Sequence, residues 1–126
     1  MSNLRDIGEV SAVDVWGETV QARAIVGDNA SFAIVELTPG AIVPAHQHHN
    51  EQMGICIEGS VTFTIADEQR ELFPGGTWLI PSNAPHTAVA GPDGAILLDI
   101  FSPARTDWND LPKSTPKPPR WPPSRG

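Results

Sequence analysis

The sequence predicts an all-β fold, a single barrel or sandwich built from short strands. Its 126 residues are enough for one domain with one hydrophobic core. Turn-forming residues are frequent, with 11 glycines and 13 prolines, a balance that favours short strands and tight turns over long helices. Runs rich in β-branched residues recur at regular spacing between turn signals, which is typical of barrels and sandwiches and not of βαβ units.

The strand-like runs can be placed in chain order. We expect strands at 20–27, 31–38, 52–59, 61–68, 77–82 and 94–101. Explicit turn sequences separate them, namely GDNA at 27–30, TPG at 38–40, FPGG at 73–76 and GPDG at 91–94. Each of these breaks joins two strand-like runs.

The last part of the chain differs in character from the rest. Residues 103–126 hold seven of the thirteen prolines and show no apolar periodicity. We therefore divide the chain into a barrel at 1–102 and an extended, polyproline-like tail at 103–126. Two interpretations of the tail are open: a solvated chain end, or a strap that packs Trp108 or Trp121 onto a neighbouring subunit.

Charge and cysteine content limit the partners that this protein can have. The net charge is −7, and five of the eight basic residues follow Ser102, so residues 1–102 hold three bases against thirteen acids. Such an acidic body repels nucleic acids and anionic membrane surfaces. Cys56 has no second cysteine to pair with, and neither a signal sequence nor a membrane-length apolar run is evident. We expect a cytoplasmic protein with a small-molecule partner, no nucleic acid and no membrane.

Histidines cluster in a way that indicates a metal site. Three of the four, His46, His48 and His49, lie within the segment PGAIVPAHQHHNEQMG. Residues two apart on a strand share a face, so His46 and His48 can point to one place while His49 points away. His86 follows a later strand, and antiparallel pairing could bring it beside them. Three imidazoles suit several divalent metals.

These residues resemble the cupin superfamily. The two characteristic motifs of that family fall in order and with matching intervals on Gly40, His46, His48, Gln52 and Gly59, and then on Gly75, Pro81, Asn83, His86 and Ala90. The resemblance implies a single cupin β-barrel, also called a double-stranded β-helix or jelly roll. It implies one divalent ion, Zn, Ni, Mn or Fe, bound by His46, His48, Gln52 and His86. A homodimer is also expected from the family.

Three positions depart from the family pattern. Gln52 stands where a glutamate is usual, Asn83 replaces a glycine, and Ala90 replaces an asparagine. Glu51 cannot easily take the place of Gln52, because its side chain should lie on the opposite strand face. The Gln52 amide either binds the metal or only forms a hydrogen bond inside the barrel. A neutral ligand set would leave the full charge on the metal, which favours Lewis-acid chemistry.

The segment GAILLDIFSPARTDW provides further candidates. Asp99 interrupts an apolar run and shares a face with Leu97 and Phe101, so its carboxyl group is either structural or functional. Arg105 could pair with Asp99, bind a substrate carboxylate, or lie on the surface. Cys56 is best explained as a small core residue.

The same segments resemble a narrower group, the small cupins that linearise unsaturated uronates from pectin and alginate. That resemblance implies catalytic roles for Asp99 and Arg105, and substrate binding by Phe101 and Arg105, beside the metal. The loop between His48 and Gln52 is one residue shorter than in that group.

These features together favour a metal-dependent enzyme of isomerase or lyase type. The metal would act as Lewis acid on a small oxygen-rich substrate, and Asp99 would move a proton at carbon. Two alternatives stay open: an Fe(II) dioxygenase, which would need oxygen, and a non-catalytic binding or sensing module.

Overall fold

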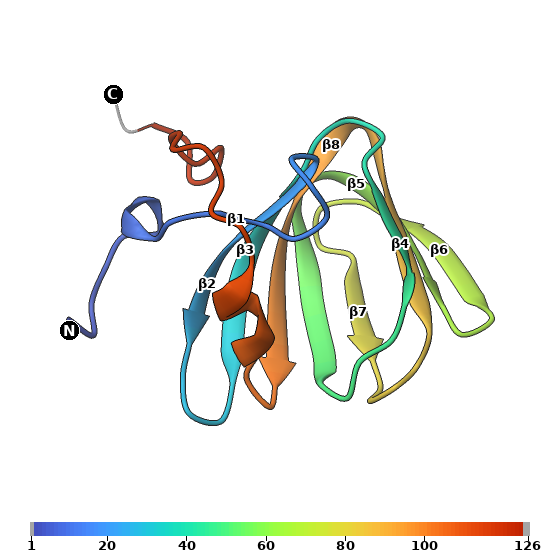
Figure 1. Cartoon of the computed structure of the whole chain (residues 1–126). Coiled ribbons are helices and arrows are strands. Elements are labelled where there is room, and N and C mark those ends of the chain that lie inside the picture. The colour runs from blue at the N-terminus through green and yellow to red at the C-terminus, as the bar shows by residue number, and fades with distance from the viewer. Residues whose placement is uncertain (1, 125–126) are drawn as a thin grey trace.

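The computed structural model describes residues 2–124, and it has one curved antiparallel sheet that closes into a barrel (Figure 1). The strands are β1 Val13–Asp14, β2 Val20–Val26, β3 Ser31–Leu37, β4 Ile42–His46, β5 Glu51–Ile65, β6 Glu68–Leu72, β7 Thr77–Ile80 and β8 His86–Ser102. Two 3-10 turns flank them, η1 Ile7–Glu9 and η2 Thr106–Asp110. The prediction of an all-β barrel is confirmed.

Two long strands form the middle of this sheet. The order is β1-β2-β3-β8-β5-β6, with β4 added to β8 and β7 added to β5. The sequence predicted separate strands at 52–59 and 61–68 and a break at 91–94, and this was wrong. β5 and β8 run through these places as a pair, with register shifts at Cys56/Glu58 and Gly59/Val61. Bulges and glycines bend the paired strands there without reversing the chain.

The core lies between the walls of the barrel and is built from inward-facing apolar side chains. The largest fully buried side chains of this core are Phe101, Leu37, Ile80, Val20, Val61 and Cys56. Cys56 is a core residue, as expected, and burial raises the pKa of its thiol. A buried thiol with a raised pKa is not a good nucleophile, because less of it is present as thiolate.

The end of the chain packs against its own barrel. Trp108 in η2 is buried and contacts the Phe101 ring edge-on, with 5.1 Å between ring centroids. Further along, Ser114 Oγ donates a hydrogen bond to Asp14 at 2.6 Å. Trp108 is therefore not part of a solvated chain end, since it packs on its own barrel. A strap through Trp121 stays a prediction. The division at residue 102 stays a prediction.

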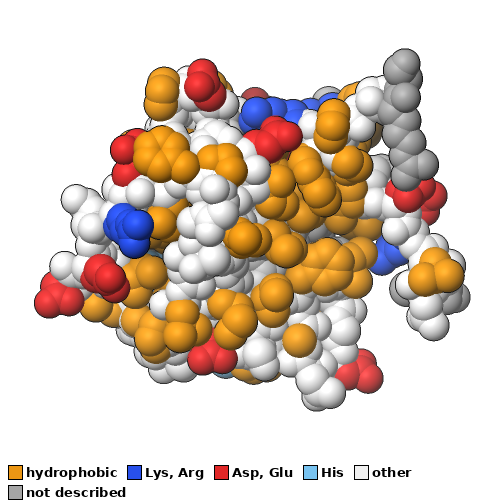
Figure 2. All heavy atoms as spheres, turned by 180° about the vertical axis from the view of Figure 1, so that it is seen from behind, with side chains coloured by type: hydrophobic (Ala, Val, Ile, Leu, Met, Phe, Trp, Pro, Cys, Tyr) orange, Lys and Arg blue, Asp and Glu red, His pale blue; other side chains and the backbone are white. Residues whose placement is uncertain are grey.

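Hydrophobic side chains gather on the rear face of the molecule (Figure 2). On the outer side of β3, β8, β5 and β7, the strand register aligns two apolar rows: Phe32, Ile100, Met53 and Leu79, and beside them Ile34, Leu98 and Ile55. We call these rows the outer apolar face. Its members Phe32, Ile100, Met53 and Leu79 are 39–56% exposed.

Within residues 2–124, no helix has the length and apolar character needed to span a membrane. The cytoplasmic location stays a prediction.

Candidate metal centre

Three histidine side chains converge inside the barrel. His46 ends β4 and His86 begins β8, and the two residues are direct cross-strand partners. His48 lies in the loop after β4, so the strand alternation used to place it did not apply. Even so, one ring nitrogen from each of the three lies within 4.8 Å of the others. His49 is exposed and outside this group, as predicted.

Backbone carbonyl groups orient all three imidazoles in the same way. The Nδ1 atoms lie beside the carbonyl oxygens of Pro44 (2.8 Å from His46), Ala84 (2.9 Å from His86) and Asn50 (3.0 Å from His48). A carbonyl oxygen can only accept a hydrogen bond, so each Nδ1 carries the proton. Each Nε2 is then left with a free lone pair, which is the form that binds a metal.

The residues present fit a divalent metal ion. Among the described residues, His86 Nε2 is the buried side-chain nitrogen or oxygen that has no hydrogen-bond partner. Such an atom is costly unless something binds it. Burial lowers the pKa of His86 to about 4 and also lowers the pKa of His48, with a smaller contribution from the Arg105 charge. Both imidazoles therefore remain neutral near pH 7, as ligation requires.

Gln52 points its amide oxygen at the histidines. Its Oε1 lies 3.2 Å from His48 Nε2, while its Nε2 donates a hydrogen bond to Asp99 Oδ1 at 2.9 Å. A carboxylate accepts hydrogen bonds, so Asp99 fixes which end of the amide faces it. The amide does form a hydrogen bond inside the barrel, but through nitrogen, which leaves oxygen available as a fourth ligand. Glu51 is exposed.

Asp99 is a buried acid with two hydrogen-bond donors on one oxygen. Trp78 Nε1 donates to Oδ1 at 2.7 Å, beside the bond from Gln52. Burial raises the pKa of Asp99 to about 6, and these hydrogen bonds oppose the shift only in part. A carboxyl group with such a pKa can take up and release a proton near neutral pH.

Sequence reasoning missed Trp78, and the structure shows why the indole reaches Asp99. Gly54 on β5 pairs with Trp78 on one side and with Asp99 on the other. A Cβ atom at position 54 would lie 2.5 Å from the indole ring. The absence of a side chain therefore lets Trp78 lie across β5, stacked on Phe63 at 4.4 Å. The sequence shows Gly54 and Trp78 in two separate strand-like runs but not that they pair, so it carried no signal for this contact.

Arg105 lies between aromatic rings and an acid from its own segment. Its guanidinium carbon is 4.9 Å from the Phe101 ring centre and 4.8 Å from that of Trp108. Nε and Nη2 each donate to Asp107 at 3.1 Å, and this lowers the pKa of Asp107. The ion-pair partner of Arg105 is thus Asp107, and a pair with Asp99 does not form. Arg105 is also not a free surface arginine, since its side chain is only 12% exposed.

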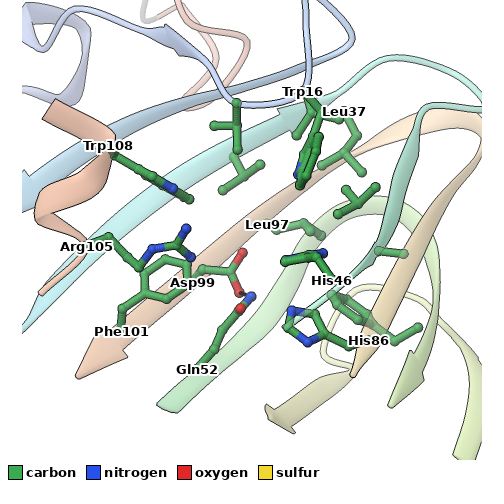
Figure 3. Close-up of a pocket in the computed structure, with 16 residues that line it drawn as sticks. Trp16, Leu37, His46, Gln52, His86, Leu97, Asp99, Phe101, Arg105 and Trp108 are labelled. Carbon is green, nitrogen blue, oxygen red and sulfur yellow. Dashed lines mark hydrogen bonds between the residues drawn. The ribbon is translucent and has the colours of Figure 1, made fainter. Parts of the chain in front are cut away.

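A pocket connects these groups (Figure 3). His46, His86, Gln52, Asp99, Phe101 and Arg105 line it together, so every predicted site residue except His48 is in its wall. Trp16 and Trp108 also line it, and sequence reasoning missed both. The interior volume open to the centre of a water molecule is about 80 Å³. Three convergent histidines, a buried carboxyl group and a fixed cation around one pocket are features typical of a small-molecule site.

Comparison with known proteins places these features in context. The family model described as "Cupin domain" matches residues 33–101. The chain is 30% identical over 94 residues to the pectin degradation protein KdgF of Dickeya dadantii, covering 73% of this chain and 86% of that protein. It is 33% identical over 81 residues to the oxalate decarboxylase OxdC of Bacillus subtilis, covering 60% of this chain but only 21% of that protein. The solved structure of KdgF from Halomonas sp. superposes with a TM-score of 0.77 at 27% identity, covering 85% of this chain and 98% of that one.

Proposed function

Because this chain belongs to the cupin domain family, we propose that it is a metal-dependent enzyme that linearises an unsaturated uronate or a similar enol-containing ring. One observation carries the proposal: the buried Asp99 carboxyl is joined through the Gln52 amide to a three-histidine site. The similarity to two KdgF proteins, one of them named for pectin degradation, supports the substrate class.

His46, His48, His86 and the Gln52 oxygen would hold the divalent ion, which is Zn, Ni, Mn or Fe. When bound, the ion supplies Lewis-acid polarisation of substrate oxygens, undiminished by any ligand charge. Arg105 would bind the substrate carboxylate and hold the ring against Phe101.

The proton transfer falls to Asp99. Opening the hemiacetal of the unsaturated ring releases its ring oxygen as an enol. The enol becomes a ketone when a proton is added at carbon and the proton on oxygen is lost. This is an isomerisation and needs no oxidant. With a pKa of about 6, Asp99 can deliver the one proton and accept the other near neutral pH.

Asp99→Asn tests this proposal on one purified variant. The substituted amide oxygen can accept the bonds from both Trp78 and Gln52, since both go to Oδ1. The fold and the metal content should therefore stay unchanged. Turnover should fall roughly 10²-fold, because the amide has no acidic proton to transfer. The measurements are metal content, melting temperature and loss of the ultraviolet absorbance of an unsaturated uronate. Asp93→Asn, exposed on the same strand, is the matched control.

Turnover of this variant and of the wild type, with and without oxygen, distinguishes the three candidate functions. Unchanged turnover in Asp99→Asn would remove this residue from the mechanism. Turnover that requires oxygen would identify a dioxygenase, and binding without turnover would identify a sensing module. Isomerisation under anaerobic conditions supports the proposal.

The homodimer expected from the family would use the outer apolar face. Its two rows carry no charged side chain, although residues 1–102 hold thirteen acids. A second copy of this acidic chain can approach closely only where such charges are absent, and exposed Met, Phe and Ile side chains are typical of interface cores.

Light scattering during size-exclusion chromatography tests the dimer. We expect two copies in the wild type and a monomer in Met53→Lys, because the substitution places a charge in the middle of the face. Ile42→Lys, on β4 outside the two rows, should stay dimeric. A monomeric wild type would refute this use of the face.

A further inference from the structure

Trp16 holds an exposed indole at the pocket, next to a metal-site histidine. The side chain lines the pocket and is 38% exposed. Its ring centroid lies 5.4 Å from that of His46, with the planes tilted by 58°. Figure 3 shows the indole reaching toward His46 from the opposite side of the pocket to Arg105. The indole thus borders both the histidine cluster and solvent.

The turn that carries Trp16 does not need the indole to form. Val15 N and Trp16 N both donate to Val20 O, at 2.9 and 3.3 Å, and Thr19 Oγ1 donates to the Trp16 carbonyl at 3.3 Å. Gly17 supplies the positive φ of 67°. These are backbone bonds or involve another side chain. The indole is therefore placed by the turn but does not hold it together.

The indole lies where a ligand of the histidines would pass. Trp16 lines the same pocket as His46, His86 and Arg105, and its partial exposure places it on the solvent side of that pocket. A ring acid bound at the histidines, with its carboxylate toward Arg105, would therefore have the indole beside it.

We propose that Trp16 determines specificity by packing its indole against the ring of the bound acid. This inference rests on the proposed function. The C–H face of a sugar ring is apolar and fits the face of an indole, whereas a flexible open chain presents no such flat surface. The site thus favours the cyclic acid over the linear one. Since ring opening turns the first into the second, loss of the Trp16 contact also helps the product to leave.

Isothermal titration of the Ni²⁺-loaded protein tests the proposal with two probes that need no turnover. D-galacturonate is a ring acid without the double bond, and D-gluconate is an open-chain acid of the same carbon number. The wild type should bind galacturonate more tightly than gluconate. Trp16→Ala should weaken galacturonate about tenfold and change gluconate less than twofold. Trp16→Phe, which keeps an aromatic face, should recover most of the loss.

Two controls accompany this comparison. Trp121→Ala removes a tryptophan of the tail that does not line the pocket, and it should bind both acids like the wild type. Ni²⁺ affinity and melting temperature are measured on every variant. Both should stay unchanged in Trp16→Ala, because backbone bonds hold the turn and the Pro44 carbonyl orients His46.

The titrations distinguish a failure of the Trp16 role from a failure of the proposed substrate class. If galacturonate binds wild type and Trp16→Ala equally, the role of Trp16 is wrong and the proposed function stands. Equal weakening of both acids would also overturn it, since the indole would then not select rings. If neither acid binds the Ni²⁺-loaded wild type, the proposed substrate class fails, and this inference fails with it.

Discussion

At the scale of single residues, Asp99 connects the two halves of the proposed chemistry. Its Oδ1 orients the Gln52 amide toward the histidines, and its raised pKa suits proton transfer. The usual glutamate of the family at position 52 would place a second carboxylate beside Asp99, and two carboxylates at hydrogen-bond distance cannot both stay ionised. A glutamine avoids that conflict. The departure from the family motif thus has a physical reason in the neighbouring strand.

Gln52 should contribute directly to metal affinity. Gln52→Ala removes the amide oxygen that faces His48 Nε2, so affinity should fall by about an order of magnitude or more. Glu51→Ala, one residue earlier and exposed on the outer side, is the matched control and should change little. Competition titrations with a metal indicator measure both variants. The reverse pattern would assign the ligand to Glu51.

At the scale of elements, the N-terminal segment and the tail form one layer, joined by the Asp14 carboxylate and by backbone hydrogen bonds. Asp14 in β1 accepts hydrogen bonds from Ser114 Oγ at 2.6 Å and from Gln21 Nε2 at 2.8 Å. Beside these, Asp14 N donates to Pro112 O and Ser114 N donates to Ala12 O, each at 2.9 Å. The tail therefore continues the edge of the sheet at β1.

This docking should weaken in acid. The bonds from Ser114 and Gln21 lower the pKa of Asp14 below its ordinary value of 3.8. Below that value the unfolded chain takes up a proton that the folded chain resists, so stability falls as pH falls. Urea unfolding at pH 5.5 and pH 3 should show a larger loss for the wild type than for Asp14→Asn. The difference between the two losses cancels the contribution of the other carboxylates, which both proteins share. Equal losses would contradict the prediction.

At the scale of the whole molecule, the tail completes the outer surface of the barrel and the wall of the pocket. Arg23 donates to Lys117 O at 2.8 Å, and Glu36 accepts from Arg120 N at 2.7 Å. Arg23 and Glu36 are 5% and 9% exposed, so the barrel alone would leave both without these partners. Nearer the site, Asn50 Nδ2 donates to Pro103 O at 2.6 Å where the chain leaves β8.

Two truncations test how far the barrel depends on the tail. A chain ending at Asp110 keeps every proposed ligand, so it should fold and bind metal. It should nevertheless lose roughly 1–3 kcal/mol for each of Arg23 and Glu36, because each loses the charge-assisted hydrogen bond that it forms with the tail. A chain ending at Arg120 keeps both contacts and should lose much less. Chemical unfolding of the two chains gives the comparison, and equal stability would show that the tail only rests on the surface.

The sequence by itself determined the all-β class, the family and the candidates for the metal site. Those conclusions follow from local patterns. Turn residues recur at regular intervals, and the residues of two family motifs occur in this chain in the expected order and at the expected spacing. Gln52 was chosen over Glu51 by motif spacing and strand alternation. Asn83, which replaces a glycine, has the positive φ of 64° that Asn tolerates better than other residues with a side chain.

Only the tertiary structure decided which distant groups meet. Strand register brings Gly54 between Trp78 and Asp99, and no local pattern gives the pairing of three strands. The turn residues at 91–94 looked like a chain reversal but bend a continuous strand, because bulges in β5 accompany the bend. Trp16 and Trp108 reach the pocket from opposite ends of the chain. Long-range packing, which sequence periodicity does not encode, placed both indoles there.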